Sequence, residues 1–315
     1  MKKMISIIVP CYNEQEVLPM FYEEINKVFA TMDYEHELVL VNDGSKDSTL
    51  SIMKELAEKD ENVTYISFSR NFGKESAMYA GLCNVKGDYI AVMDADLQDP
   101  PSLLPEMAAL LESGEYDCIA TRRATRAGEP PIRSWFARRF YSIMNLISDA
   151  TLMDGARDFR LMTREMVDAI VSMSERDRFS KGIFGWVGFR FHWIAYENIE
   201  RAAGTTKWSF WKLFKYSIDG FVNFSRVPLN IAAVLGVLMA FGSFAALIVL
   251  ALRSIFGGAA FAGWGSLVSI VCFIGGLILS CIGVMGLYIA KIHKEVKARP
   301  HYIISDTNRD LPRIR

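Results

Sequence analysis

Charge is missing from two long stretches near the C-terminal end of the chain, which argues against an ordinary soluble protein. Residues 229–252 carry no charged side chain, and after Arg253 residues 254–290 carry none either. About 20 apolar residues are enough to span a bilayer as a helix. The pattern therefore predicts two membrane helices, at about 229–252 and 267–290, rather than buried helices of a soluble domain.

Cysteine is scarce, and the few that occur follow no metal-binding or disulfide pattern. The five positions are Cys11, Cys83, Cys118, Cys272 and Cys281. Their number is odd, their spacing is irregular, and the last two fall inside the second predicted span. Scattered cysteines of this kind are typical of a reducing compartment, and they predict neither a disulfide framework nor a zinc site.

No secretory signal is expected, because the first apolar run of the sequence is too short and no small-residue cleavage site follows it. Lysine and arginine near the span ends set the expected orientation. Arg226 precedes the first span, Arg253 stands alone in the connecting loop, and four basic residues follow the second span: Lys291, Lys294, Lys297 and Arg299. We therefore expect a multi-pass protein of the inner (plasma) membrane, with both termini and the N-terminal two-thirds in the cytoplasm.

Residues 5–122 alternate short β-rich runs with amphipathic stretches. The runs ISIIVP, HELVLVND, VTYISFS, DYIAVMDAD and YDCIATR predict strands, and the stretches near 15–32, 47–60, 74–85 and 101–113 predict helices. This alternation predicts an α/β fold with a Rossmann-like, mainly parallel, doubly wound sheet. Ligands of such sheets bind beyond the carboxyl ends of the strands. The side chains expected at that edge are Asn13, Glu14, Asp43, Arg70, Asp94 and Asp96.

Asp94 and Asp96 directly follow the fourth predicted strand. Being two residues apart, they project from one face if the strand stays extended. A divalent cation would relieve their repulsion, so the favoured interpretation is a Mg2+ or Mn2+ site to which Gln98 adds an amide oxygen. A general acid and base pair and a solvated acidic turn are the alternatives. Asp99 is expected only to turn the chain before the prolines that start the next helix.

Two later segments combine basic and aromatic residues. Residues 123–160 are rich in arginine and aromatics, and residues 208–224 place large aromatics such as Trp211 on one helical face, with Lys212 and Lys215 off it. Such a helix just before a membrane span is typical of one that lies in the headgroup plane. The alternative is that the helices expected in the two segments simply pack onto the core of the domain.

Seven short motifs occur in a fixed order along the chain: VPCYNE, VNDGS, SRNFGK, MDADLQDPP, TRR, DFRLMTRE and GTTKWS. This order resembles the family 2 glycosyltransferases with a GT-A fold. More narrowly, it resembles the polyprenyl-phosphate branch that includes dolichol-phosphate mannose synthase and the bactoprenol (undecaprenyl-phosphate) glucosyltransferases. The similarity covers about residues 4–226, and the two C-terminal spans match the bacterial bactoprenol type. One departure is Arg157 before DFRL, where a small residue is expected.

The resemblance implies an inverting transfer of a hexose, glucose above others, from a UDP-sugar to undecaprenyl (polyprenyl) phosphate at the cytoplasmic membrane face, for modification of a cell-envelope glycan. It implies nucleotide contacts from Pro10, Tyr12, Glu14, Asp43, Lys74 and Asp94. It implies a Mg2+ or Mn2+ ion held by Asp94, Asp96 and Gln98. The implied catalytic residues are Asp96, Asp158 and Arg122, with Asp158 orienting an arginine or the sugar, or acting as an accessory base.

The acceptor requires a positively charged binding site rather than a strong base, because a lipid phosphate is already anionic near neutral pH. Guanidinium groups match phosphate oxygens in bidentate fashion. The candidate residues of this phosphate-binding site are Arg122, Arg138, Ser142 and Lys207. Arg133 and Arg139 are neighbours that could exchange roles with Arg138.

The expected organisation is a cytoplasmic GT-A domain at 1–207 with an acceptor-side region at about 123–160, an amphipathic interface helix at 208–226, two membrane helices within 227–297 and a polar cytoplasmic tail at 298–315. The expected partners are the UDP-sugar, the polyprenyl phosphate and the bilayer. Glycines in the second span also offer a surface for a homo-oligomer. No nucleic-acid partner is expected.

Several other functions share part of this pattern. Processive polysaccharide synthases have similar early motifs, but their QxxRW motif needs a late glutamine, and this chain has only Gln15 and Gln98. Spans without charge disfavour a lipid flippase. A membrane-tethered nucleotide-sugar binding protein without turnover is the alternative from another class, and the same reaction with another sugar, such as GDP-mannose, is the alternative within the class.

Overall fold

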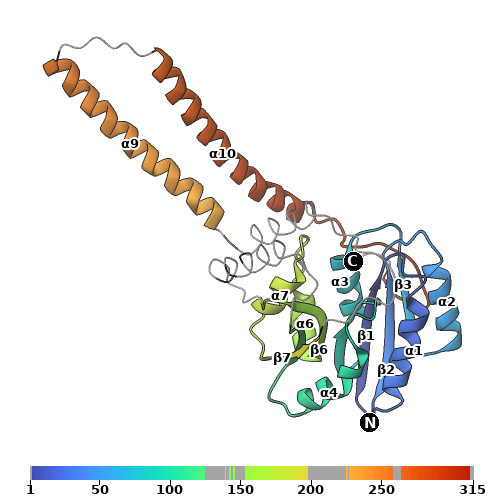
Figure 1. Cartoon of the computed structure of the whole chain (residues 1–315). Helices are drawn as coiled ribbons and strands as arrows, with labels where there is room; N and C mark the ends of the chain where they lie inside the picture. Colours follow the sequence, from blue (N-terminus) through green and yellow to red (C-terminus); the bar gives the residue numbers. More distant parts are fainter. Residues whose placement is uncertain are drawn as a thin grey trace.

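The computed structural model describes residues 2–124, 153–197, 225, 227–257 and 264–312, with the single positions 139, 142 and 145. Figure 1 shows a sheet wrapped by helices, from which two long helices project. The strand order of the described sheet is β7-β5-β6-β4-β1-β2-β3-β8. Most of the predicted helix at 208–224 and most of the basic region 123–160 lie outside the described residues.

The middle of the sheet is parallel and forms from the strands that the sequence predicts. These are β1 (Met4–Cys11), β2 (Glu35–Asn42), β3 (Val63–Phe68) and β4 (Tyr89–Val92). The helices that connect or follow them are α1 (Leu18–Phe29), α2 (Thr49–Lys59), α3 (Lys74–Asn84) and, after the 3-10 turn η1 (Pro101–Leu103), α4 (Leu104–Glu112). The expected α/β fold with a mainly parallel sheet is therefore confirmed.

Three further strands extend the sheet beyond β4. They are β5 (Cys118–Arg123), β6 (Ala156–Thr163) and β7 (Phe191–Tyr196). β6 runs antiparallel between β4 and β5, and β7 runs parallel to β5. The helices α6 (Arg164–Ser172) and α7 (Ser180–Trp186) lie between β6 and β7. Because β6 pairs with β4, its first residues lie beside the loop that follows β4.

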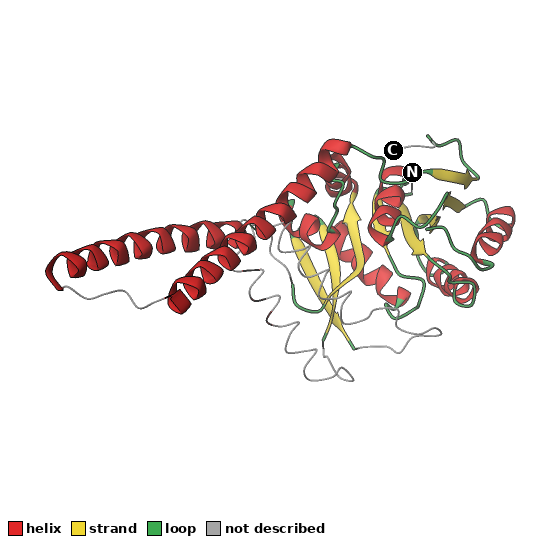
Figure 2. Ribbon diagram, turned by 90° about the horizontal axis from the view of Figure 1, so that it is seen from above, coloured by secondary structure: helices red, strands yellow, loops and turns green. Residues whose placement is uncertain are grey.

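Two apolar cores cover the two faces of the sheet. Figure 2 shows the helices that lie over these faces. Successive residues of β1 point to opposite faces, so Ile7 enters the core under α1, α2 and α4, whereas Ile8 enters the core under α3, α6 and α7. Both side chains are fully buried. This doubly covered arrangement explains why the predicted strands read as continuous apolar runs.

The two projecting helices are α9 (Val227–Gly257) and α10 (Trp264–Lys297). Over the residues that the structure describes, one stretch, Phe273–Lys297, is long and apolar enough to cross a membrane, and a shorter apolar stretch, Leu229–Met239, lies in α9. One of the two expected spans therefore has a counterpart by length and composition. The other stays a prediction, although its residues are helical within α9.

The C-terminal residues differ from the polar tail expected at 298–315. After α10 the chain returns to the domain and forms β8 (Ile304–Thr307), which pairs antiparallel with β3. Tyr302 is 1% exposed and its ring stacks on Phe68, with centroids 5.1 Å apart. The sequence did not predict this strand, because a strand of four residues is too short to show a clear alternation of apolar and polar residues.

Candidate active site

Two loops at the carboxyl edge of the sheet, the edge at which β1 to β4 end, are hydrogen-bonded to one another. The backbone N–H of Asn13 donates to Ser45 Oγ at 2.9 Å, and the N–H of Lys46 donates to Asn13 Oδ1 at 2.9 Å. The N–H of Glu14 donates to Thr49 Oγ1 at 2.9 Å. These bonds hold the VPCYNE loop against the VNDGS loop, as strand ends on one edge predict.

Asp43 joins the end of β2 to the loop before α3. Its carboxylate is 4% exposed and accepts the backbone N–H groups of Phe72 at 2.6 Å and Gly73 at 3.0 Å. Burial raises the pKa of Asp43, and these two hydrogen bonds oppose that rise. Gly44 has a φ of 65°, and a Cβ there would lie 2.4 Å from the carbonyl carbon of Arg70. The turn therefore requires glycine and brings the SRNFGK loop onto β2.

Lys74, the first residue of α3, lies between two carboxylates. Its Nζ is 2.6 Å from Asp94 Oδ1 and 2.5 Å from Asp158 Oδ2. The side chains of Lys74, Asp94 and Asp158 are 40%, 25% and 17% exposed. The structure thus brings together three predicted site residues from separate motifs, and we call them the charged cluster.

Electrostatics fix the protonation of the charged cluster. Burial alone would lower the pKa of Lys74, but attraction to Asp158 and Asp94 outweighs it and raises that pKa. Burial likewise opposes ionisation of Asp158, yet Lys74 and Lys181 hold its pKa well below the usual range. A carboxylate with so low a pKa accepts a proton poorly. In this arrangement Asp158 is suited to orienting a cation or a sugar hydroxyl rather than to acting as a base.

The expectation that Asp94 and Asp96 share one face of an extended strand is wrong. β4 ends at Val92, and both aspartates lie in the irregular segment that follows. Within it, Leu97 has a φ of 55°, and the backbone N–H of Gln98 donates to Asp96 Oδ1 at 3.2 Å. The loop, not strand alternation, decides where these carboxylates point.

The chemistry of the predicted metal ligands fits a hard divalent cation. Asp94 already attracts the ammonium of Lys74, and the amide oxygen of Gln98 accepts a hydrogen bond from Arg123 Nη2 at 3.3 Å. Among the described residues, no group of three or more His, Cys, Asp or Glu side chains could hold a metal ion. Mg2+ is typically bound by one or two carboxylates plus substrate phosphates. These residues therefore fit a cation that also needs a substrate diphosphate.

Asp99 has a larger role than the turn expected of it. Its side chain is fully buried, and its Oδ1 accepts hydrogen bonds from Arg157 Nε at 2.7 Å and from the Tyr196 hydroxyl. Burial alone would lower the pKa of Arg157, but Asp99 raises it. The arginine that departs from the family pattern is thus the counter-charge of Asp99, and it ties the MDADLQDPP loop to β6 next to Asp158.

The predicted acceptor residues are only partly described. Arg122 is exposed on β5, in register with Ala156 of β6. Ser142 is helical and exposed. Arg138 and Lys207 lie outside the described residues, as does Arg133. Of the nucleotide-side residues, Pro10 and Tyr12 are half-buried at the end of β1 and in the loop after it.

Several residues around the charged cluster were not predicted from the sequence. Glu75 accepts hydrogen bonds from the backbone N–H and hydroxyl of Ser180. Arg160 is 2% exposed, with its guanidinium 3.7 Å from the Phe184 ring centroid. Lys181 donates to the carbonyl oxygen of Ala156 at 3.2 Å. Only Arg160 left a signal, as an arginine between the apolar residues Phe159 and Leu161 of β6.

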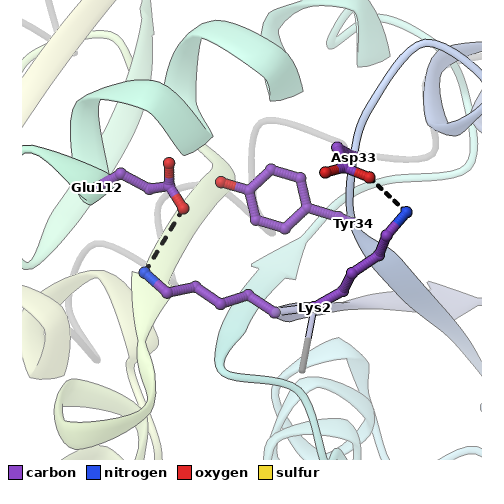
Figure 3. Close-up of a pocket in the computed structure, with 5 residues that line it drawn as sticks. Lys2, Asp33, Tyr34 and Glu112 are labelled. Atoms are coloured by element: carbon purple, nitrogen blue, oxygen red, sulfur yellow. Dashed lines mark ion pairs between the residues drawn. The ribbon is translucent and has the colours of Figure 1, made fainter.

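A polar pocket lies at the opposite edge of the sheet, near the N-terminus (Figures 1 and 3). Its lining residues are Lys2, Lys3, Asp33, Tyr34 and Glu112. Lys2 pairs with Asp33, and Lys3 pairs with Glu112 at 3.5 Å. Since these charges already neutralise one another and α/β sheets bind ligands at the carboxyl edge, this pocket is not the candidate site.

Comparison with known proteins defines the class. Residues 6–171 match the family model "Glycosyl transferase family 2". The Bacillus subtilis protein named "Putative glycosyltransferase CsbB" is 42% identical over 98% of this chain and 94% of its own length. A prophage-derived bactoprenol glucosyl transferase of Shigella flexneri is 39% identical over 98% of this chain and 99% of its own, and an Escherichia coli homologue is 40% identical over 95% and 98%.

This chain therefore belongs to glycosyl transferase family 2, and it is a glycosyltransferase. The resemblance to the bactoprenol glucosyl transferases that the motifs indicate is confirmed over nearly the full length. The roles assigned to individual site residues stay predictions, because the comparisons identify the family and not the function of each side chain.

Proposed function

We propose that this protein transfers glucose, with inversion, from UDP-glucose to undecaprenyl phosphate at the cytoplasmic face of the membrane. The observation that carries this proposal is the charged cluster at the carboxyl edge, where Lys74 bridges Asp94 and Asp158. Support comes from relatives named bactoprenol glucosyl transferase that match this chain from end to end. The product would be a polyprenyl-phosphate sugar for cell-envelope glycan modification.

The nucleotide would lie at the ends of β1 and β2, and its diphosphate near the charged cluster. Lys74 would contact the diphosphate, and Asp94, Asp96 and Gln98 would hold a Mg2+ or Mn2+ ion. Bound there, the cation would act as a Lewis acid that stabilises the charge of the departing UDP. Its two carboxylate neighbours keep Lys74 in its charged form, and the charged ammonium group can bind the anionic diphosphate.

The acceptor phosphate would attack without a strong base. A phosphate monoester has a second pKa of about 6, so it is largely dianionic at neutral pH. One of its oxygens forms the bond to the anomeric carbon while the bond from that carbon to the diphosphate breaks, and UDP leaves. Arg122 would contact the attacking phosphate, and Asp158 would orient the sugar or a basic neighbour. Arg138, Ser142 and Lys207 stay proposed acceptor contacts.

The membrane location has separate support. Large side chains on α9 and α10 are unusually exposed, with Phe241 at 71% and Leu279 at 70%, and exposed apolar surface of this extent requires a cover. Lys291 and Lys294 of α10 pair with Asp177 of the catalytic domain. The basic end of α10 and the catalytic domain therefore share one side, which agrees with the orientation expected from charge.

The test uses the full-length protein in lipid nanodiscs with undecaprenyl phosphate and a panel of radiolabelled UDP- and GDP-sugars. We expect a glucosyl lipid from UDP-glucose that depends on Mg2+ or Mn2+ and is lost in Asp96→Ala. Lys59→Met, on the exposed end of α2, serves as the matched control. Equal transfer to a prenol lacking phosphate, or full activity of Asp96→Ala with the metal chelated, would contradict the proposal. Preference for GDP-mannose would contradict the donor assignment alone.

A further inference from the structure

Lys181 is a half-buried lysine that faces the charged cluster without a carboxylate of its own. Its Nζ donates to the carbonyl oxygen of Ala156 at 3.2 Å. Among the residues that the structure describes, Lys181 forms no ion pair. Its charge nevertheless acts on Asp158, whose pKa it helps to lower. A half-buried ammonium group without a direct counter-ion suits an anionic ligand.

The position of Lys181 is fixed by the residue before it. Ser180 donates both its backbone N–H, at 3.0 Å, and its hydroxyl to Glu75 Oε2. Glu75 follows Lys74 in the first turn of α3, so the first turns of α3 and α7 are held together. Lys74 and Lys181 therefore act on Asp158 from the first turns of two different helices, whose relative position these bonds hold.

Lys181 also lies beside the strands that lead to the acceptor side. Ala156, whose carbonyl oxygen it contacts, pairs in register with Arg122 of β5. On the other side, the segment just before α7 is attached to the base of α10. The backbone N–H of Arg176 donates to Glu295 at 2.6 Å, and Asp177 pairs with lysines of α10. The segment that carries Lys181 is thus linked to the charged cluster through Ser180 and to the base of α10 through Arg176 and Asp177.

We propose that Lys181 is a phosphate-binding residue of the active site. This inference rests on the proposed function, which brings two phosphate groups to this edge: the diphosphate of the sugar donor and the monophosphate of the lipid acceptor. The ammonium supplies the same chemistry to either, a charge-assisted hydrogen bond to a phosphate oxygen. Its hydrogen bond to Ala156, which pairs with Arg122, and the attachment of the segment before α7 to α10 favour the acceptor phosphate.

The test compares Lys181→Met, Lys181→Arg and the control Lys59→Met in the full-length protein. Three quantities are measured: the Kd for UDP in the presence of Mg2+, the KM for undecaprenyl phosphate, and the Tm. A hydrogen bond to a charged group contributes about 1.5–3 kcal/mol, so its loss weakens phosphate binding about tenfold or more. We expect this loss in Lys181→Met with little change in Tm, and partial recovery in Lys181→Arg, which keeps the charge.

The two phosphate sources give different results. A raised KM for undecaprenyl phosphate with an unchanged Kd for UDP identifies the acceptor phosphate, and the reverse identifies the donor diphosphate. If neither quantity changes, or if the losses follow a fall in Tm and Lys181→Arg restores nothing, Lys181 is only a structural contact of Ala156 and the inference is overturned. UDP binding needs no turnover, so a protein that binds UDP but transfers no glucose would refute the proposed function separately.

Discussion

Replacing Lys74 by methionine tests the charged cluster most directly. The substitution keeps an unbranched side chain of similar length but removes the ammonium that bridges Asp94 and Asp158. Two carboxylates then face each other without a cation between them. Each lies within 2.6 Å of the ammonium, so their oxygens are separated by about 5 Å at most.

The magnitude follows from Coulomb's law. Two unit charges about 5 Å apart repel by about 3 kcal/mol at an effective dielectric constant of about 20. Lys74 is 40% exposed and Asp94 25% exposed, so solvent screens part of this interaction. We therefore expect Lys74→Met to lower the free energy of unfolding by about 2 kcal/mol at pH 7. For a domain of this size that corresponds to a fall in Tm of roughly 4–8 °C.

The effect of Lys74→Met must depend on pH in a defined direction. The wild-type pKa of Asp158 lies below that of an unfolded chain, so its contribution to stability is present above about pH 4 and is lost as the pH falls through the folded-state pKa. The variant lacks that contribution and carries a raised carboxylate pKa. The difference in Tm should therefore be largest near pH 7. The part that comes from the raised carboxylate pKa of the variant should disappear as the pH falls towards about 4, and the part that comes from the lowered pKa of Asp158 should disappear only below about pH 4.

Thermal unfolding of the full-length protein at a series of pH values measures this difference, with Lys59→Met as the control. A difference in Tm that stays constant from pH 7 to below pH 4 would mean that only packing was lost. That result, or no difference at pH 7, would refute the electrostatic reasoning.

Three further substitutions test the surroundings of the site through urea unfolding. Gly44→Ala forces a side chain into a positive φ and against the backbone of Arg70, and should cost about 3 kcal/mol; a change below measurement error would contradict the close approach. Tyr302→Ala removes the ring stacked on Phe68 and should also cost about 3 kcal/mol, whereas a truly detached tail would tolerate it. Asp99→Asn removes the buried counter-charge of its arginine partner and should cost about 3 kcal/mol, with partial recovery when that arginine is also changed to methionine.

The sequence was informative wherever a strand end carried a motif. The carboxyl ends of β1 to β4 meet at one edge, so the placement of Asp43, Lys74 and Asp94 near one another follows from the alternation of strands and helices alone. The contact with Asp158 does not follow from it. It requires β6 to lie antiparallel beside β4, and a pairing between segments about 70 residues apart leaves no local pattern. Only the resemblance to a family suggested Asp158.

Other features depend on tertiary partners that local sequence does not reveal. In the sequence, Asp99 was expected only to turn the chain, and Arg157 stood where a small residue was expected. Their ion pair forms only because the fold brings the two side chains together in the interior. Lys181 was overlooked for the same reason, since a lysine at the start of a short helix is ordinarily a solvated charge. Burial and the absence of a carboxylate partner among the described residues, rather than residue type, distinguish it.

The return of the chain from α10 to the sheet bears on how a lipid phosphate reaches the site. α10 is attached to the catalytic domain twice, through the pairing of Asp177 with Lys291 and Lys294, and through β8, which begins a few residues after the helix ends. A helix attached at both places cannot tilt freely relative to the sheet. An acceptor phosphate cannot leave the headgroup plane without exposing its prenyl chain to water. In the proposed function, the site must therefore stand at a fixed height above the membrane, and the strand that follows α10 helps to set that height.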